Sequence, residues 1–336
     1  MAKRLGLEDR LMGALMGAAV GDALGVPYEF THRVQRKNDP ASKMEGWMEH
    51  NQPPGTWSDD TSMTLGVAQA LIDHAGQPLD DAFLKQMVVY FVAWMRKAAF
   101  TAGHHMFDIG NTTAAVLRQY PEQYAANQPL VFYGEDHEGA QGNGSLMRLI
   151  PLALWNAFHP LSQDLIDKSS EITHGHPNVL AICNHYINFV DGLVQWSQSH
   201  AGEDFPIVDL LKAATAKGEA YHREANYHFD IDTLLARSYD SFEGKADGYV
   251  LYSIELVYWC LAHSKSFKEA TLLAVNMGED TDTHASIVGS LAGFIYGLSG
   301  IPEDWLKVLR NKELLDNTYS TFLECLLSSK LASKEV

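Results

Sequence analysis

Apolar residues recur with the period of an α-helix along most of this chain. Met63, Val67, Ala68 and Leu71 follow that spacing. The same pattern covers 84–95, 144–158, 177–197, 247–262, 266–276 and 283–298. Alternating apolar and polar runs bounded by turn residues, which indicate half-buried strands, are scarce. The periodicity therefore predicts an all-α fold.

Turn-rich stretches separate these helices, but none has the character of a linker between domains. They lie at 31–55, 101–110, 134–144, 198–206 and 222–230. None is long enough or simple enough in composition to be a disordered connection. With 46% hydrophobic residues the chain can bury a sizeable core. We expect one compact helical domain over residues 1–336.

Two of the expected helices carry a glycine at every fourth position. The rows are Gly13, Gly17, Gly21 and Gly25 in the first helix, and Gly289, Gly293 and Gly297 in the late one. Glycine costs a helix about 1 kcal/mol unless packing compensates, and such rows let helix backbones approach closely. We expect the rows to pack against each other or against a shared neighbour. Contact between them would bring Asp22 and Glu29 towards the acidic residues near 280.

The net charge limits the kinds of partner that the protein can bind, and the cysteine content indicates the cellular compartment. The formal charge of −17 excludes proteins that grip the phosphate backbone of nucleic acid, because that binding needs clustered Lys and Arg. Cys183, Cys260 and Cys325 are too few and too scattered for a disulfide framework or a cysteine zinc site. We therefore expect a cytoplasmic protein.

Two apolar stretches resemble membrane segments. Residues 11–20 follow Lys3 and Arg4 as in a secretion signal, but Glu8 and Asp9 interrupt the approach and no clear cleavage site follows. The uncharged stretch 285–302 contains four glycines and follows an acidic cluster. This favours a buried helix over a membrane span of about 20 residues, so we expect no membrane partner.

Dense clusters of hydroxyl and carboxylate residues stand directly before two periodic helices. The first contains Ser58, Asp59 and Asp60, and the second runs from Asp280 to Thr283. N-capping is one interpretation, because Ser, Thr and Asp accept hydrogen bonds from the free N–H groups of a first turn. One such residue per helix would suffice, however, and neighbouring carboxylates repel one another unless a cation lies between them. Hard oxygen ligands suit Mg²⁺, Mn²⁺ or Ca²⁺, so the two clusters together predict a metal site.

Two further motifs remain ambiguous on local grounds. Pro27 should end the first helix and leave Glu29 in a partly buried turn, where a lone Glu is more often solvated or capping. The loop 142–145, Gly-Asn-Gly-Ser, leads into a periodic segment and is either a phosphate site at a helix start or a flexible turn with a Ser cap. A Ser145 nucleophile with His174 as base is conceivable, but the G-x-S-x-G motif and a preceding strand are missing.

Seven motifs, taken together, resemble those of the ADP-ribosylglycohydrolase family, which includes the dinitrogenase reductase-activating glycohydrolase and the ADP-ribosylarginine and ADP-ribosylserine hydrolases. They are GALMGAAVGDALGVPYEF, GTWSDDTSMTL, DIGNTT, GNGSLMRLIPLAL, ITHGHP, ADGYVLYSIELVYWCL and GEDTDTHASIVGSLAGFIYG. Each is weaker alone than their joint match in this order. The resemblance implies an all-α domain of orthogonally packed helices with a binuclear Mg²⁺ or Mn²⁺ centre at the base of a cleft.

The resemblance also implies roles for individual residues. The metal ligands would be Ser58, Asp59, Asp60, Asp280, Asp282 and Thr283. Residues near the ADP-ribose would be Gly110, Asn143, Gly144, Ser145 and His174. The catalytic residues would be Glu29, Asp60 and Asp280. One departure is Glu279, where many relatives have Gly.

These roles imply a hydrolase that removes ADP-ribose from modified protein side chains, with ADP-ribosylarginine the first candidate. Cleavage at the anomeric carbon passes through an oxocarbenium-like state. Two metal ions would orient the ribose hydroxyls and acidify a bound water that attacks this carbon. Glu29 or a ligand aspartate would accept the water's proton or assist the leaving group.

Hypotheses from other classes of protein stay open beside the enzyme. An immunity or binding protein would neutralise an ADP-ribosylating toxin by gripping it, with hydrolysis secondary, and its partner would be the ADP-ribosyltransferase rather than an ADP-ribosylated protein. A crystallin-like structural protein would tolerate the loss of metal ligands. The intact acidic clusters count against the structural protein.

Overall fold

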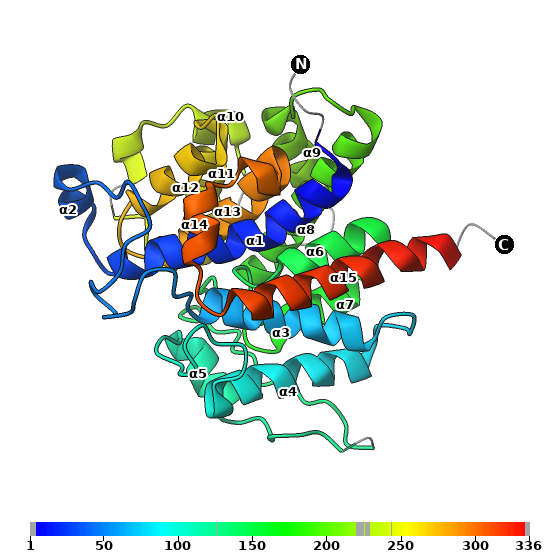
Figure 1. Ribbon diagram of the computed structural model, residues 1–336. Coiled ribbons are helices and arrows are strands. Elements are labelled where there is room, and N and C mark those ends of the chain that lie inside the picture. The colour runs from blue at the N-terminus through cyan, green and yellow to red at the C-terminus, as the bar shows by residue number, and fades with distance from the viewer. Residues whose placement is uncertain (1–4, 126, 220–224, 226–228, 243, 333–336) are drawn as a thin grey trace.

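The computed structural model describes residues 5–125, 127–219, 225, 229–242 and 244–332. Within these ranges the chain forms helices and no β-strand, which confirms the predicted all-α fold (Figure 1). The longer helices are α1 (Leu7–Gly25), α3 (Asp59–Asp73), α4 (Asp81–Lys97), α8 (Pro177–Ser199), α9 (Ile207–Glu219), α11 (Val250–Ala262), α13 (Thr281–Tyr296) and α15 (Lys312–Ala332). The shorter ones are α2 (Arg33–Asn38), α5 (Asn111–Leu117), α6 (Ile150–Phe158), α7 (Gln163–Glu171), α10 (Ile231–Leu235), α12 (Phe267–Val275) and α14 (Glu303–Val308). Single 3₁₀ turns are η1 (Val26–Tyr28), η2 (Tyr239–Phe242) and η3 (Leu298–Gly300).

Helices α1 and α13 form the central pair of the fold, and they run antiparallel along their glycine rows. A Cβ atom on Gly13 would lie 2.3 Å from the carbonyl oxygen of Gly293, and one on Gly21 would lie 1.9 Å from that of Ala285. Only residues without a side chain permit so close a backbone approach. The expected contact between the two rows is confirmed. It places the carboxyl end of α1 beside the amino end of α13.

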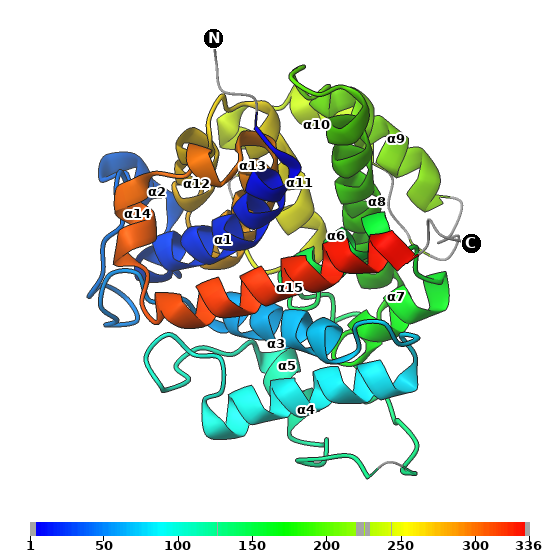
Figure 2. The ribbon, with the colours of Figure 1, turned by 45° about the vertical axis from the view of Figure 1, so that its right-hand side comes forward.

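The other helices pack around this pair over one contiguous hydrophobic core. Helix α15 lies across α1 and α3, and α4 covers the outer face of α3 (Figures 1 and 2). Helices α6, α7 and α9 contact α8, while α11 and α12 contact α13. The chain thus surrounds a core in which α1, α3 and α13 meet.

Helix boundaries differ from the predicted ones in a few places. The periodic segment predicted from 144 begins as turns, and α6 starts only at Ile150, because Pro151 occupies its first turn, where a missing N–H costs nothing. Seven of the described helices have no counterpart among the predicted segments: α2, which lies in the turn-rich stretch 31–55, and α5, α7, α9, α10, α14 and α15. Most of the stretch 222–230 lies outside the described residues.

The two apolar stretches that resemble membrane segments lie largely in the core. Leu7–Tyr28 is long and apolar enough to cross a membrane by length and composition, but 94% of its apolar window is buried inside the protein. Helix α13, expected to be a buried helix, is buried without interruption from Thr281 to Phe294. Burial on every side explains why neither helix has a polar face.

Candidate active site

The end of the central helix pair collects carboxylates from three distant parts of the chain. Asp22 of α1, Asp60 of α3 and Asp282 of α13 each contribute an oxygen atom to a group that lies within 4.8 Å. Glu29, Asp280 and Asp282 form a second group of the same size. The structure therefore brings together the two acidic clusters that the sequence places more than 200 residues apart.

Asp22 caps α3 from outside that helix. Its carboxylate accepts hydrogen bonds from the backbone N–H groups of Ser58 (2.9 Å) and Thr61 (3.0 Å), and from both hydroxyl groups (2.9 and 2.6 Å). Burial raises the pKa of Asp22 to about 6, although these hydrogen bonds oppose the shift. Ser58 and Asp280, at the N-cap positions of α3 and α13, make no capping hydrogen bonds with their side chains. Capping therefore does not account for the two acidic clusters.

The other carboxylates of the cluster have too few hydrogen-bond donors around them. Asp60 Oδ1 and Asp282 Oδ2 are buried and have no hydrogen-bond partner among the described residues. Burial, followed by repulsion from the neighbouring carboxylates, raises the pKa of Asp59, Asp60 and Asp282 well above the usual range. No Lys or Arg in the described ranges forms an ion pair with them. A buried anionic oxygen without a partner is costly, and a divalent cation with oxygen ligands would satisfy these atoms.

The hydroxyl groups of the predicted metal site lie within the same cluster. Ser58 Oγ is 3.2 Å and Thr283 Oγ1 is 3.4 Å from Asp60 Oδ2. The structure thus brings five predicted ligands into one cluster: Ser58, Asp60, Asp280, Asp282 and Thr283. The sixth, Asp59, lines the cavity together with Asp280 and Thr283. Asp22, which was not a predicted ligand, joins the cluster. Asp22 directly follows Gly21 in the glycine row that contacts α13, and this position was the available sequence signal that Asp22 lies near the site.

Glu29 directly follows η1, and its carboxylate lies beside those of Asp280 and Asp282. His50 Nε2 contacts its Oε2 atom, and Asp108 completes a group of three possible metal-binding side chains. Burial, and then the charges of Asp108 and Asp280, raise the pKa of Glu29 to about 10. Neither His50 nor Asp108 was among the residues predicted for the site. Asp108 begins the motif DIGNTT, which was the available signal, whereas nothing in the local sequence distinguished His50.

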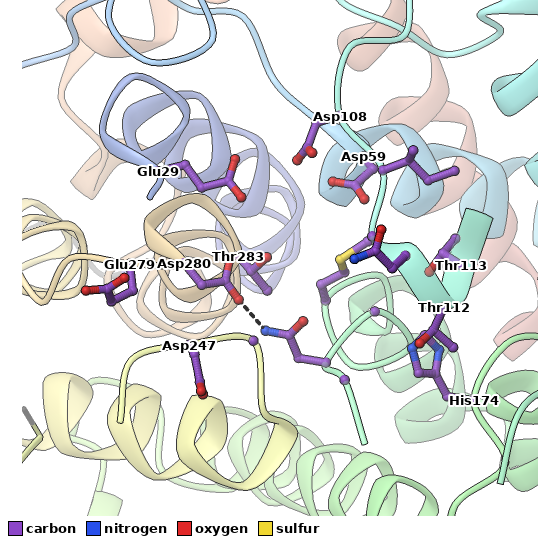
Figure 3. A pocket seen from close by; sticks show the side chains of 18 of the residues that line it. Glu29, Asp59, Asp108, Thr112, Thr113, His174, Asp247, Glu279, Asp280 and Thr283 are labelled. Carbon is purple, nitrogen blue, oxygen red and sulfur yellow. Dashed lines mark hydrogen bonds between the residues drawn. The ribbon is translucent and has the colours of Figure 1, made fainter. Parts of the chain in front are cut away.

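A cavity of about 570 Å³ opens above the carboxylates. Glu29, Asp59, Asp280 and Thr283 line one part of it, and Figure 3 shows the carboxylates of Glu29, Asp59 and Asp108 turned towards one another. The buried Asp60 does not line the cavity. Four of the predicted substrate residues line it: Gly110, Asn143, Gly144 and His174.

Ser145 is the predicted substrate residue that the structure places away from the cavity lining. It is 1% exposed, and its hydroxyl contacts Ser170 Oγ (2.8 Å) and Cys183 Sγ (3.5 Å). The imidazole of His174 contacts Thr173 instead, at 2.8 Å from Nδ1 to Oγ1. The geometry therefore offers no nucleophilic pair of Ser145 and His174.

Asn143 is held against the acidic cluster rather than at a helix start. Its Nδ2 atom donates to Asp280 Oδ2 at 2.7 Å, drawn as a dashed line in Figure 3, and to Ser253 Oγ at 2.9 Å. Its backbone N–H donates to the carbonyl of Gly248 at 3.0 Å. Because α6 begins only at Ile150, the Gly-rich loop does not form the first turn of a helix. Of the two alternatives for this loop, the phosphate site at a helix start is therefore not met.

Glu279 adopts a backbone conformation that favours glycine. Its φ angle is +59°, in the left-handed region that costs a residue with a Cβ atom. Its N–H donates to Thr31 O (2.8 Å), and its carbonyl accepts from Phe30 N–H (2.7 Å), so it ties down the segment that carries Glu29. Its side chain lines the cavity and contacts His32 Nδ1 at 2.8 Å.

Comparisons with known proteins give matches over nearly the whole chain. A family model described as ADP-ribosylglycohydrolase matches residues 3–334. An ADP-ribosylarginine hydrolase of Serratia proteamaculans is 30% identical over 317 residues, covering 92% of this chain and 77% of the relative. The ADP-ribosyl-[dinitrogen reductase] glycohydrolase of Rhodospirillum rubrum is 28% identical, covering 91% and 92%. A solved structure titled "ADP-ribosylglycohydrolase-related protein complex" superposes with a TM-score of 0.72 at 27% identity, covering 95% of this chain and 99% of that one.

Proposed function

The chain belongs to the ADP-ribosylglycohydrolase family, and on that premise we propose that it is a metal-dependent hydrolase that releases ADP-ribose from modified arginine side chains of proteins. The observation that carries the metal dependence is the pair of buried oxygens, Asp60 Oδ1 and Asp282 Oδ2, that have no donor. Both belong to one cluster of carboxylates at the base of a cavity. Such atoms require a cation or a proton.

Two Mg²⁺ or Mn²⁺ ions are the proposed cofactors. Ser58, Asp59, Asp60, Asp280, Asp282 and Thr283 would hold them, with Asp22 as an additional carboxylate below the cluster. Bound there, the cations would supply positive charge for orienting the ribose hydroxyls and for lowering the pKa of a water molecule. Asp60 does not line the cavity, so its proposed part is confined to holding metal.

Glu29 is the proposed acid–base residue. It lines the cavity beside Asp280, where its carboxyl group can take up or deliver a proton. A group that holds a proton next to the scissile bond can deliver it to the departing nitrogen. Asp280, which lines the cavity beside Glu29, would hold a cation close to the ribose whose anomeric carbon is attacked. Asn143 fixes Asp280 in this orientation through its Nδ2 donor.

Two observations support arginine as the modified side chain. The relatives from Serratia proteamaculans and Pseudomonas putida are both named as ADP-ribosylarginine hydrolases. In addition, Asp247 and Glu279 line the cavity near Asp280, and their carboxylates suit a cationic guanidinium (Figure 3). The proposed partner is therefore a protein that carries ADP-ribosylarginine.

The decisive test is release of free ADP-ribose from arginine-, serine- and cysteine-linked ADP-ribosyl proteins, with Mg²⁺, Mn²⁺ or chelator. We expect release from the arginine linkage with metal only. Asp59→Asn and Asp282→Asn should each lower turnover by at least ~100-fold, because metal-assisted stabilisation contributes several kcal/mol. The exposed Glu138→Gln is the matched control. Equal activity with metal and with chelator, or full activity of both Asp variants, would contradict the metal mechanism. If no ADP-ribose were released from any of the three linkages, the proposal that the protein is a hydrolase would be wrong.

A further inference from the structure

Arg148 is a buried cation without an ion-pair partner among the described residues. It is 1% exposed, and its Cζ atom lies 4.6 Å from the centre of the Phe91 ring. Its Nη2 atom donates to Ser169 O at 3.3 Å and to Thr173 Oγ1 at 2.9 Å, while Nη1 has no partner. Burying a charge in this way is unfavourable, so a role beyond packing is expected.

The hydroxyl group of Thr173 connects Arg148 to His174. Thr173 is fully buried, and its Oγ1 atom lies 2.8 Å from His174 Nδ1. Because Arg148 has only donors, the hydroxyl oxygen accepts from the guanidinium. The one hydroxyl proton then needs an acceptor, and His174 Nδ1 is the acceptor within reach. No other acceptor for that proton occurs among the described residues. The arrangement that satisfies the hydroxyl proton therefore has Nδ1 unprotonated and the ring proton on Nε2.

The ring of His174 is held at the wall of the cavity by the Gly-rich loop. A Cβ atom on Gly144 would lie 2.8 Å from His174 Cε1, and one on Gly142 would lie 3.4 Å from Nε2. Glycine at position 144 leaves room for the ring, whereas a Cβ atom at position 142 would make only an ordinary van der Waals contact with it. Figure 3 shows His174 near Thr112 and Thr113, on the side of the cavity away from Glu279. No hydrogen-bond partner of Nε2 occurs among the described residues.

We propose that Arg148 and Thr173 are positioning residues that lock His174 in its Nε2–H tautomer, so that the ring presents a neutral hydrogen-bond donor to a phosphate oxygen of the ligand. The identity of that ligand as ADP-ribose rests on the proposed function. Phosphate oxygens accept hydrogen bonds and carry negative charge, so they require donors at a distance from the carboxylate cluster. The chain of contacts from Arg148 through Thr173 to His174, called the relay below, supplies such a donor on the side of the cavity away from Glu279.

The charge state of His174 agrees with this arrangement. Burial, followed by the nearby guanidinium of Arg148, lowers the pKa of His174 to about 3. The ring is therefore neutral at physiological pH, and one of its two nitrogens carries no proton. The hydroxyl of Thr173 decides which nitrogen that is.

The tautomer can be observed directly by long-range ¹H–¹⁵N correlation spectroscopy on protein with ¹⁵N-labelled histidine. His174→Gln assigns the signal by its disappearance. Wild-type His174 should show a protonated Nε2 and an unprotonated Nδ1, Thr173→Ser should keep this pattern, and Thr173→Val should give a mixture of tautomers. A protonated Nδ1 in the wild type would overturn the relay whatever the protein binds.

Binding of ADP-ribose, measured by calorimetry with Mg²⁺ present, tests the consequence. Thr173→Val should bind ADP-ribose roughly 10-fold more weakly, the change expected for one hydrogen bond to a charged group, whereas Thr173→Ser should bind as the wild type does. Mg²⁺ binding and the circular dichroism spectrum should be unchanged in both, and the loss should appear in KM rather than kcat. Unaltered binding by Thr173→Val would overturn the relay alone. A wild type that binds no ADP-ribose would overturn the proposed function and the relay's ligand with it.

Discussion

Asp22 and Asp60 lie in the same buried cluster, but their surroundings differ. Asp22 accepts hydrogen bonds from the backbone and hydroxyl groups of Ser58 and Thr61. Asp60 receives only hydroxyl contacts on Oδ2, and its Oδ1 has no partner. Because α1 supplies the cap of α3, the carboxylates of Asp59 and Asp60 are not needed for capping. They are therefore available to bind a cation.

Asn143→Ala should weaken metal binding, because it removes the donor that holds Asp280 Oδ2. Loss of a partner that orients a ligand typically costs about 10-fold or more in metal affinity or activity. Titration calorimetry with Mn²⁺ measures the effect. Asn111→Ala is the matched control, since Asn111 also lines the cavity but is exposed. Equal affinities of the two variants would contradict a role of Asn143 in orienting Asp280 for metal.

His185 should make the protein sensitive to acid. Its ring is fully buried between Tyr258 Oη and Thr215 Oγ1, each 2.8 Å away, and burial lowers its pKa to about 3. The unfolded chain binds a proton near pH 6.5, whereas the folded protein does not until far lower pH, so stability falls as the pH drops below about 6.5. Urea denaturation should show that His185 accounts for a loss of about 2 kcal/mol between pH 7 and 5. If the His185→Gln variant had the same pH slope, this assignment would be refuted.

At the scale of helices, the contact between α1 and α13 decides where the functional groups meet. Gly13, Gly17 and Gly21 each face a backbone carbonyl of α13 at a distance that excludes any side chain. The antiparallel direction of the pair then places Asp22 opposite Asp282. A small shift along this contact would separate the two halves of the proposed metal site, so the glycine rows position these carboxylates as well as the core.

Gly21→Ala should destabilise the fold by about 1–3 kcal/mol, because a Cβ atom there would lie 1.9 Å from the carbonyl oxygen of Ala285. Thermal unfolding measures the change. Gly218→Ala in α9 is the control, since the nearest atom to its Cβ would be 3.9 Å away, and the higher helix propensity of alanine should leave stability equal or raised. A Gly21→Ala variant as stable as the control would mean that the helices can separate at little cost.

At the scale of the whole molecule, the fold concentrates negative charge at one place in an already acidic protein. The chain carries a formal charge of −17, and Glu29, Asp59, Asp108 and Asp280 lie close enough for each to raise the pKa of a neighbour. Folding without a cation must therefore bring together groups that repel one another. A cation that binds only the folded state offsets this repulsion.

Removal of divalent cations should consequently lower the melting temperature. At a free Mg²⁺ or Mn²⁺ concentration of about 100 Kd, mass action stabilises the folded state by roughly 2.7 kcal/mol, which corresponds to a shift of roughly 5 °C for a chain of this size. Differential scanning calorimetry with metal and with chelator measures the shift. The Asp60→Asn, Asp282→Asn double variant should melt at one temperature under both conditions. Identical wild-type curves would be inconsistent with a metal site.

The sequence by itself determined the features that repeat locally. Helical periodicity specified the all-α class, and the glycine rows specified a close contact between two helices. The acidic clusters before α3 and α13 specified most of the carboxylates that gather at one end of this helix pair. Each of these signals lies within a single helix or its first turn. The sequence therefore contained them without knowledge of how the helices pack.

Only the tertiary structure decided which residues share the site. Asp22 caps α3 from 36 residues away, Asn143 holds Asp280 from 137 residues away, and His50 contacts Glu29 across a turn-rich segment. Ser145, two positions from Asn143, is instead turned into the core and hydrogen-bonded to Ser170. The physical reason is that hydrogen bonds between side chains depend on direction and distance to within about half an ångström, and packing of the whole chain sets both.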